Sequence, residues 1–183
     1  MITLTPVKRT VLASLCAALC VVLPIAFHAI PNAGSIFLPM HIPVLLCGMI
    51  CGWPYGLLCG LMGPALSSML TGMPPAAMLP AMMLECAVYG AVTGLMLKLL
   101  RTGRLTLDLY ISLITAMLAG RVISGIAKAL IFSPGITMGA WITASFITAL
   151  PGIIVQLIAI PLLVSLLMKT HQIPERYKEG AIS

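Results

Sequence analysis

Long apolar stretches separated by short polar segments make up most of the chain. A helix that crosses a membrane needs about 20 mostly apolar residues. Six apolar stretches are candidates for such helices, and the second of them is much shorter than this. They cover residues 9–27, 41–52, 54–71, 81–100, 108–131 and 141–168. The pattern predicts an all-α integral membrane protein with six transmembrane helices, folded as a single domain over residues 1–183.

Residues 41–72 allow two interpretations, because they contain no charged side chain other than that of His41. They form either one long helix or two shorter helices that fold back at Gly52-Trp53-Pro54, a sequence typical of turns. Two helices place all flanking basic residues on one side of the membrane, so we predict two. The first, residues 41–52, reaches only about 18 Å of the roughly 30 Å hydrocarbon core and must therefore be surrounded by protein.

Glycine and proline residues interrupt two further stretches. We predict that Gly63-Pro64 breaks the third span and that Pro151-Gly152 breaks the sixth. Short spans with such breaks often mark the place where a transported substrate binds. The pattern therefore favours an internal binding site.

Basic residues occur in alternate polar segments. Segments near 28–40, 72–80 and 132–139 contain no Lys or Arg. Because cytoplasmic loops collect positive charge, this alternation predicts that both termini are cytoplasmic. The eight residues that flank the spans on this side are Lys8, Arg9, Lys98, Arg101, Arg104, Lys169, Arg176 and Lys178.

Composition excludes several classes of protein. The chain is 61% hydrophobic and 8% charged, whereas soluble domains carry about 25% charged residues. The net charge of +6 does not indicate nucleic acid, because the cations flank apolar spans and form no stripe with interleaved aromatic residues. The lipid bilayer is the partner expected from these cations. The six cysteines fall in apolar spans and are expected to be buried small hydrophobes, so we predict no metal site and no cofactor.

A few polar residues lie inside the apolar spans, where ionisable groups are costly and usually functional. Arg121 and Lys128 share one face of the fifth span, about 10 Å apart along the helix. Glu85 and Tyr89 share a face of the fourth span at a similar depth, and Gln156 lies at mid-depth in the sixth. Glu85 pairs with either Arg121 or Lys128, which leaves one surplus positive charge. A small monoanionic ligand such as a carboxylate would neutralise it, with Arg as the better bidentate partner.

Two residues of the outer segment between the first and second spans are further candidates for the substrate site. His41 stands at the end of this segment, and Asn32 lies within it. His28 and His41 bracket this segment, but two lone histidines without carboxylates are a weak signal for metal binding. We therefore expect His41 and Asn32 to line the entrance of the substrate site.

Several motifs carry a resemblance to a known family. They are Leu-Pro-Met-His-Ile-Pro-Val-Leu-Leu-Cys-Gly at 38–48, Gly-Trp-Pro-Tyr-Gly at 52–56, Thr-Gly-Met-Pro-Pro at 71–75, Glu85 with Tyr89-Gly90, and Ala119-Gly120-Arg121. With these motifs the chain resembles, over nearly its whole length, the substrate-binding S components of energy-coupling factor (ECF) vitamin transporters. The small carboxylate expected at the site favours the branch that takes up pantothenate or nicotinate.

The resemblance implies a function and a set of partners. Such S components bind a vitamin or its precursor outside the plasma membrane of a prokaryote. They then join a transmembrane T component and two cytoplasmic ATPases for uptake, and are thought to topple in the membrane to release the substrate. The family's docking surface on the first helix maps onto Ala13 and Ala17. The chain has no phosphate-binding loop of its own, so ATP hydrolysis is expected in the partners.

Two other classes of function were weighed. A membrane-embedded enzyme would need a His-Glu-x-x-His helix or a nucleophilic serine with a histidine partner, and the sequence has neither. A stand-alone secondary transporter would couple uptake to protons through Glu85. A requirement for ATP and for a T component would distinguish the ECF subunit from such a transporter.

Overall fold

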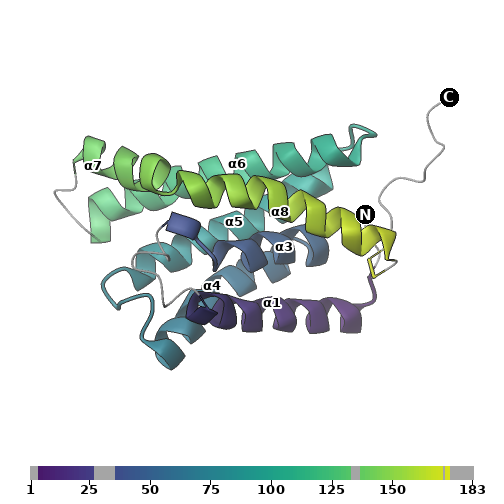
Figure 1. The fold of residues 1–183 in the computed structure, drawn as a ribbon, viewed down its shortest axis with the longest axis horizontal. Coiled ribbons are helices and arrows are strands. Elements are labelled where there is room, and N and C mark those ends of the chain that lie inside the picture. The colour runs from purple at the N-terminus through teal and green to yellow at the C-terminus, as the bar shows by residue number, and fades with distance from the viewer. Residues whose placement is uncertain (1–3, 27–35, 133–136, 171, 174–183) are drawn as a thin grey trace.

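The computed structural model is a bundle of α-helices (Figure 1). It describes residues 4–26, 36–132, 137–170 and 172–173. A π-helical turn, η1, extends the end of α6, and a second, η2, joins α7 to α8. The elements are α1 (Pro6–Ala26), α3 (His41–Cys51), α4 (Trp53–Thr71), α5 (Leu79–Leu99), α6 (Leu105–Ala127), η1 (Lys128–Phe132), α7 (Met138–Ile142), η2 (Thr143–Thr148) and α8 (Leu150–Lys169).

The all-α class predicted from the sequence is confirmed. Four helical segments in the described part of the chain are long and apolar enough to cross a membrane: Pro6–Ala26, Leu79–Leu99, Leu105–Ile131 and Leu150–Lys169. Helix α3 is apolar but shorter, and α4 has 19 residues. The number of membrane-spanning helices and the orientation of the termini stay predictions.

The stretch that allowed two interpretations forms two helices. Gly52 separates α3 from α4 and has a φ of +96°, a backbone conformation that glycine adopts without the steric cost of a Cβ atom. Helix α3 has 11 residues and is therefore about 16 Å long. Every residue of α3 except Ile42 is buried, and the helix contacts α1, α4, α5 and α8. The prediction of a short helix surrounded by protein is confirmed.

Glycine residues let α3, α4 and α5 approach closely. A Cβ atom added to Gly94 of α5 would lie 2.6 Å from the Cα atom of Trp53 and 2.7 Å from the carbonyl oxygen of Gly48. One added to Gly56 of α4 would lie 2.6 Å from the Cα atom of Gly48. Small residues at such contacts allow the van der Waals packing that holds membrane helices together. All six cysteines are buried and free, as expected.

The two predicted helix breaks have different outcomes. The Gly63-Pro64 prediction is wrong, because α4 continues through Pro64. A proline removes only one backbone donor, and membrane helices tolerate this where neighbouring groups compensate. Gly63 instead packs against α1, where an added Cβ would lie 2.9 Å from Cys20 Sγ. The sixth span is indeed interrupted, but at Ala149, two residues before the predicted Pro151-Gly152. Pro151 lies in the first turn of α8.

The flanking basic residues gather at one end of the bundle, which we call the basic end. The start of α1, the end of α5, the start of α6 and the end of α8 all lie there (Figure 1). Helix α7 and the turn η1 lie at the opposite end, which we call the far end. Arg176 and Lys178 lie outside the described residues. The basic residues at the basic end are Lys8, Arg9, Lys98, Arg101, Arg104 and Lys169.

Candidate functional site

Glu85 is the centre of a polar cluster at the far end of the bundle. Tyr89, one turn further along α5, donates a hydrogen bond of 3.0 Å from its hydroxyl to Glu85 Oε1. Lys128 Nζ, at the start of η1, lies 3.9 Å from Glu85 Oε2. His41 Nε2, at the start of α3, lies 4.0 Å from Glu85 Oε1. These four residues, which we call the Glu85 cluster, bring together three segments that are far apart in the sequence.

Packing holds Tyr89 in position beneath Glu85. The rings of His41 and Tyr89 have centroids 5.2 Å apart and planes inclined at 59°, and both side chains are buried. Gly120 of α6 lies against the Tyr89 ring, because a Cβ atom added to Gly120 would overlap two ring carbons. Tyr89 therefore sits in a space that the absence of a side chain at Gly120 creates.

The ion pair of Glu85 answers a question that the sequence left open. Lys128 pairs with Glu85, and Arg121 forms no ion pair with any described residue. The other described acidic residue, Asp108, lies in the first turn of α6 and accepts a hydrogen bond of 2.7 Å from Thr102. Formal charges of Glu85, Lys128 and Arg121 therefore leave one surplus positive charge at the far end, and it belongs to Arg121.

Arg121 lies in a second cluster, formed with residues of the segment before α8. Its Nη1 donates a hydrogen bond to the backbone carbonyl of Ser145 in η2. Its guanidinium carbon lies 5.6 Å from the centre of the Phe146 ring, within the distance at which a cation is attracted to an aromatic face. Trp141 packs edge-on against Phe146, with ring centroids 5.8 Å apart. We call Arg121, Trp141, Ser145 and Phe146 the Arg121 cluster.

Several buried donors of the Arg121 cluster lack partners. Arg121 is 4% exposed, yet its Nε and Nη2 make no hydrogen bond to the described part of the chain. The same holds for Trp141 Nε1. A buried donor without a partner costs about 1–3 kcal/mol, and more when charged. Nε and Nη2 form one edge of the guanidinium group, and a carboxylate or phosphate binds such an edge with two parallel hydrogen bonds. The arrangement is suited to an anion.

The remaining predicted substrate-site residues are placed as follows. Gln156 is fully buried in α8, and neither atom of its amide has a hydrogen-bond partner among the described residues. No hydrogen bond in the described ranges joins it to either cluster. Asn32 lies outside the described residues.

The predicted docking residues lie on α1, away from both clusters. Ala13 and Ala17 are half-buried and pack against the hydrophobic core. Their neighbours Ser14 and Ala18 are exposed.

Sequence reasoning did not find three residues of the Arg121 cluster, Trp141, Ser145 and Phe146. They lie in α7 and η2, and no periodic pattern marks the π-helical turn. One signal was present, since Gly125 follows Arg121 by one helical turn on the same face. A glycine there allows a large group to approach, and a Cβ atom added to Gly125 would overlap the indole of Trp141. The position of Ser145 and Phe146 in the π-helical turn η2 also agrees with a functional site, because π-helical turns occur frequently at such sites.

The family of the chain follows from comparison with known proteins. Residues 8–164 match the model of the substrate-specific component of ECF transporters. Because this match covers most of the chain, the protein belongs to that family, and the resemblance predicted from the motifs is confirmed at this level. The matched range includes the described residues of both clusters. No curated protein and no solved structure matches the chain.

Proposed function

We propose that this substrate-specific ECF component binds a small carboxylate vitamin or precursor at its far end and delivers it for uptake. The Nε–Nη2 edge of Arg121 carries the proposal, because it is buried and has no hydrogen-bond partner in the described part of the chain. It also bears the surplus positive charge of the site. Pantothenate and nicotinate are the candidates, since each is a small molecule with one carboxylate.

In the proposed complex the substrate carboxylate lies against this edge of Arg121. Nη1 stays on the carbonyl of Ser145, and Phe146 supports the guanidinium plane from one side. Trp141 Nε1 offers a further donor near the same ring. Hydrogen bonds to charged groups contribute about 1.5–3 kcal/mol each, so this contact would dominate the affinity for a molecule of this size.

The Glu85 cluster serves the uncharged part of the substrate. Lys128 is paired with Glu85, so it contributes less to anion binding than Arg121 does. Glu85 offers acceptor oxygens to a hydroxyl or amide of the ligand. His41 and Tyr89, whose buried rings pack against each other next to Glu85, complete this part of the site. Gln156 offers a buried amide from α8, and Asn32 belongs to the entrance segment. These roles follow from chemistry and burial and are proposals.

We propose that the bundle crosses the plasma membrane of a prokaryote with six helices and with its basic end in the cytoplasm. The gathering of the flanking basic residues at one end supports this orientation, because cytoplasmic segments are enriched in Lys and Arg. The far end, with Arg121 and Glu85, then faces the outside. A substrate-binding subunit for uptake needs its site on that side.

The partners proposed for transport are a transmembrane T component and two cytoplasmic ATPase subunits. Helix α1 is the least buried of the four long apolar helices in the described chain, which suits a docking helix. Ala13 and Ala17 lie at the border between this exposed face and the core, and Ser14 and Ala18 extend a surface of small side chains beside them. Small residues allow a partner helix to approach closely.

Membership of the family favours this assignment over a stand-alone transporter coupled to protons through Glu85. A subunit of an ECF transporter takes its energy from ATP hydrolysed in the partner subunits, so we expect no catalytic activity in this chain. Uptake by cells that contain this protein should require the T component and the ATPases. Uptake that persists without them and collapses with a protonophore would contradict the proposal.

Mass spectrometry of the small molecule that co-purifies with the protein tests the substrate class. We expect a molecule with one carboxylate. Competition then tests the charge: nicotinate should displace that molecule better than nicotinamide, or pantothenate better than its alcohol analogue pantothenol. The members of each pair differ at the carboxylate, so equal displacement within both pairs would exclude Arg121 as an anion partner.

A further inference from the structure

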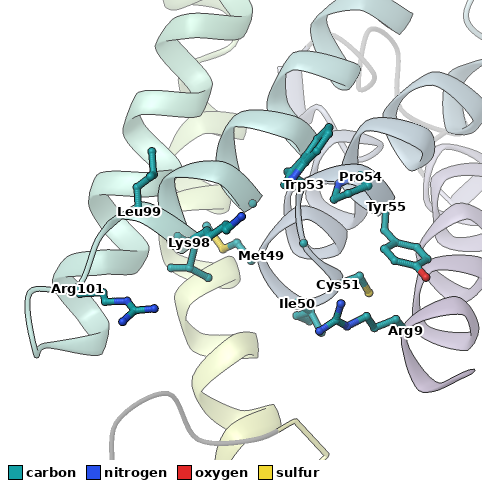
Figure 2. A pocket seen from close by; sticks show the side chains of 13 residues that line it. Arg9, Met49, Ile50, Cys51, Trp53, Pro54, Tyr55, Lys98, Leu99 and Arg101 are labelled. Carbon is teal, nitrogen blue, oxygen red and sulfur yellow. The ribbon is translucent and has the colours of Figure 1, made fainter. Parts of the chain in front are cut away.

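A cavity of about 450 Å³ opens at the basic end (Figure 2), whereas the Glu85 and Arg121 clusters lie at the far end. It lies between the start of α1, the turn from α3 to α4, and the end of α5. Its size falls within the range of about 300–1,000 Å³ that is usual for sites that bind small molecules. The buried residues among its lining include Met49, Ile50, Cys51 and Leu97.

Three basic residues line this cavity. Arg9 enters from α1 on one side. Lys98, in the last turn of α5, and Arg101, two residues after its end, lie on the other side (Figure 2). No acidic residue lines it in the part of the chain that the structure describes. Two guanidinium groups and one ammonium group around a single hollow suit a phosphate group, which arginine binds bidentately and lysine binds as a point charge.

Apolar and aromatic side chains beside the cavity indicate where the phosphate comes from. Trp53 is 43% exposed and Leu99 is 63% exposed, and both line the cavity together with the half-buried Tyr55. Tryptophan and tyrosine are enriched where a membrane meets water. A soluble anion would gain nothing from Leu99, whereas a lipid whose headgroup occupied the cavity would place its acyl chains along such exposed apolar surface.

We propose that this cavity binds the phosphate headgroup of an anionic phospholipid, such as phosphatidylglycerol. Basic pockets between transmembrane helices bind lipid headgroups in this way. The bound phosphate links Arg9 on α1 to Lys98 in the last turn of α5 and to Arg101 just after it, on the other side of the α3–α4 turn. The lipid therefore holds α1 against the rest of the bundle at the end where the helices emerge from the membrane.

Basic residues at a membrane surface also attract anionic lipid without any defined site, so the test compares two pairs of substitutions that remove the same charge. Arg9→Gln/Arg101→Gln removes two cations that line the cavity. Lys8→Gln/Arg104→Gln removes two exposed cations from the same end that do not line it. Lys98→Gln, at an exposed side chain, provides a third variant in case the first pair disturbs folding.

The full-length protein is placed in nanodiscs of phosphatidylcholine with a minor fraction of phosphatidylglycerol, and retained lipid is counted by native mass spectrometry. We expect wild type and the Lys8/Arg104 variant to retain one phosphatidylglycerol. The Arg9/Arg101 variant should bind it at least tenfold more weakly, and Lys98→Gln should fall between. A folded state is verified for each variant by its thermal unfolding in phosphatidylcholine alone.

Three results would overturn the proposal. Equal loss of lipid in the two paired variants would show diffuse attraction instead of a site. Displacement of the lipid by glycerol 3-phosphate at equal concentration would assign the cavity to a soluble phosphate ester. Undiminished lipid binding by the Arg9/Arg101 variant would exclude the cavity as the lipid site. If that variant also failed to co-purify with the T component, the cavity would be a protein contact.

Discussion

Lys128 Nζ lies 3.9 Å from Glu85 Oε2, and this ion pair determines which basic residue of the far end remains for a ligand. Lys128 and Glu85 neutralise each other formally. Arg121, deeper in α6, keeps its charge without an acidic partner among the described residues. Its Nε and Nη2 also lack hydrogen-bond partners there. The first two predictions rest on this difference: Lys128 has an acidic partner, and Arg121, on the same helix face, has none among the described residues.

Replacement of Arg121 should weaken carboxylate binding selectively. Arg121→Ala is expected to cost at least about 2 kcal/mol in binding of the co-purified carboxylate, because hydrogen bonds between charged groups are lost. Arg121→Lys should also weaken binding, since a lysine cannot reproduce the two parallel donors. Calorimetric titration of the detergent-solubilised protein measures both. Lys128→Gln is the matched control and should weaken binding less than Arg121→Ala does. Equal losses of affinity in Arg121→Ala and Lys128→Gln would contradict the assignment.

The Lys128–Glu85 pair should contribute only modestly to stability. Lys128 has a side chain 34% exposed, and solvent screens such a pair to about 1 kcal/mol or less. A double-mutant cycle with Glu85→Gln, Lys128→Gln and the double variant, followed by thermal unfolding in detergent, isolates the coupling energy. We expect Glu85→Gln to destabilise more than the double variant does, because it leaves Lys128 without its partner. A double variant whose destabilisation equals the sum of the two single changes would show that Glu85 and Lys128 are not coupled.

Gly125→Ala should damage the Arg121 cluster without unfolding the bundle. The added methyl group would overlap the Trp141 indole, so Trp141 must move and Phe146 loses its edge-on neighbour. We expect at least tenfold weaker binding of the co-purified carboxylate. Trp141 fluorescence should also change when it is recorded in a Trp53→Phe background.

The matched control for this change is Gly139→Ala in α7. A Cβ atom added to Gly139 meets no described atom within 4 Å, so binding and fluorescence should stay as in the wild type. Normal affinity in Gly125→Ala would mean that the position of Trp141 does not matter to the site.

Enlarging the small residues of α1 should separate substrate binding from transport. Ala13→Leu/Ala17→Leu and Ser14→Leu/Ala18→Leu should each leave substrate binding intact, because both sites of change lie far from Arg121. Each should prevent co-purification with the T component and the ATPases and abolish uptake. The first pair should also lower the thermal unfolding temperature, because Ala13 and Ala17 pack against the core.

The control for α1 is a change on its exposed face that does not fill a small-residue surface. Val22→Leu enlarges a side chain that is already 55% exposed, and it should leave assembly unchanged. A complete and transport-competent complex formed by either enlarged pair would exclude that pair from the docking surface.

The sequence by itself determined the all-α class, the turn between α3 and α4, and the grouping of the basic residues. These features are local: apolar runs predict helices, Gly52 permits the turn, and charges mark helix ends. It also identified Glu85, Tyr89 and Arg121 as polar residues at similar depth. Proline was the local signal that misled, because Pro64 lies inside a continuous helix whose neighbours compensate for one missing donor.

Only the tertiary structure decided which of these polar residues meet. Depth along a helix follows from sequence position, but the rotation of one helix against another follows from packing. The ring of Tyr89 fills the space beside Gly120, and this contact fixes how α5 faces α6. Lys128 rather than Arg121 then reaches Glu85. The turn η2 presents the Ser145 carbonyl to Arg121. Because one extra residue in a helical turn shifts the following side chains by roughly 100°, periodicity along the chain could not place Ser145 and Phe146 at the site.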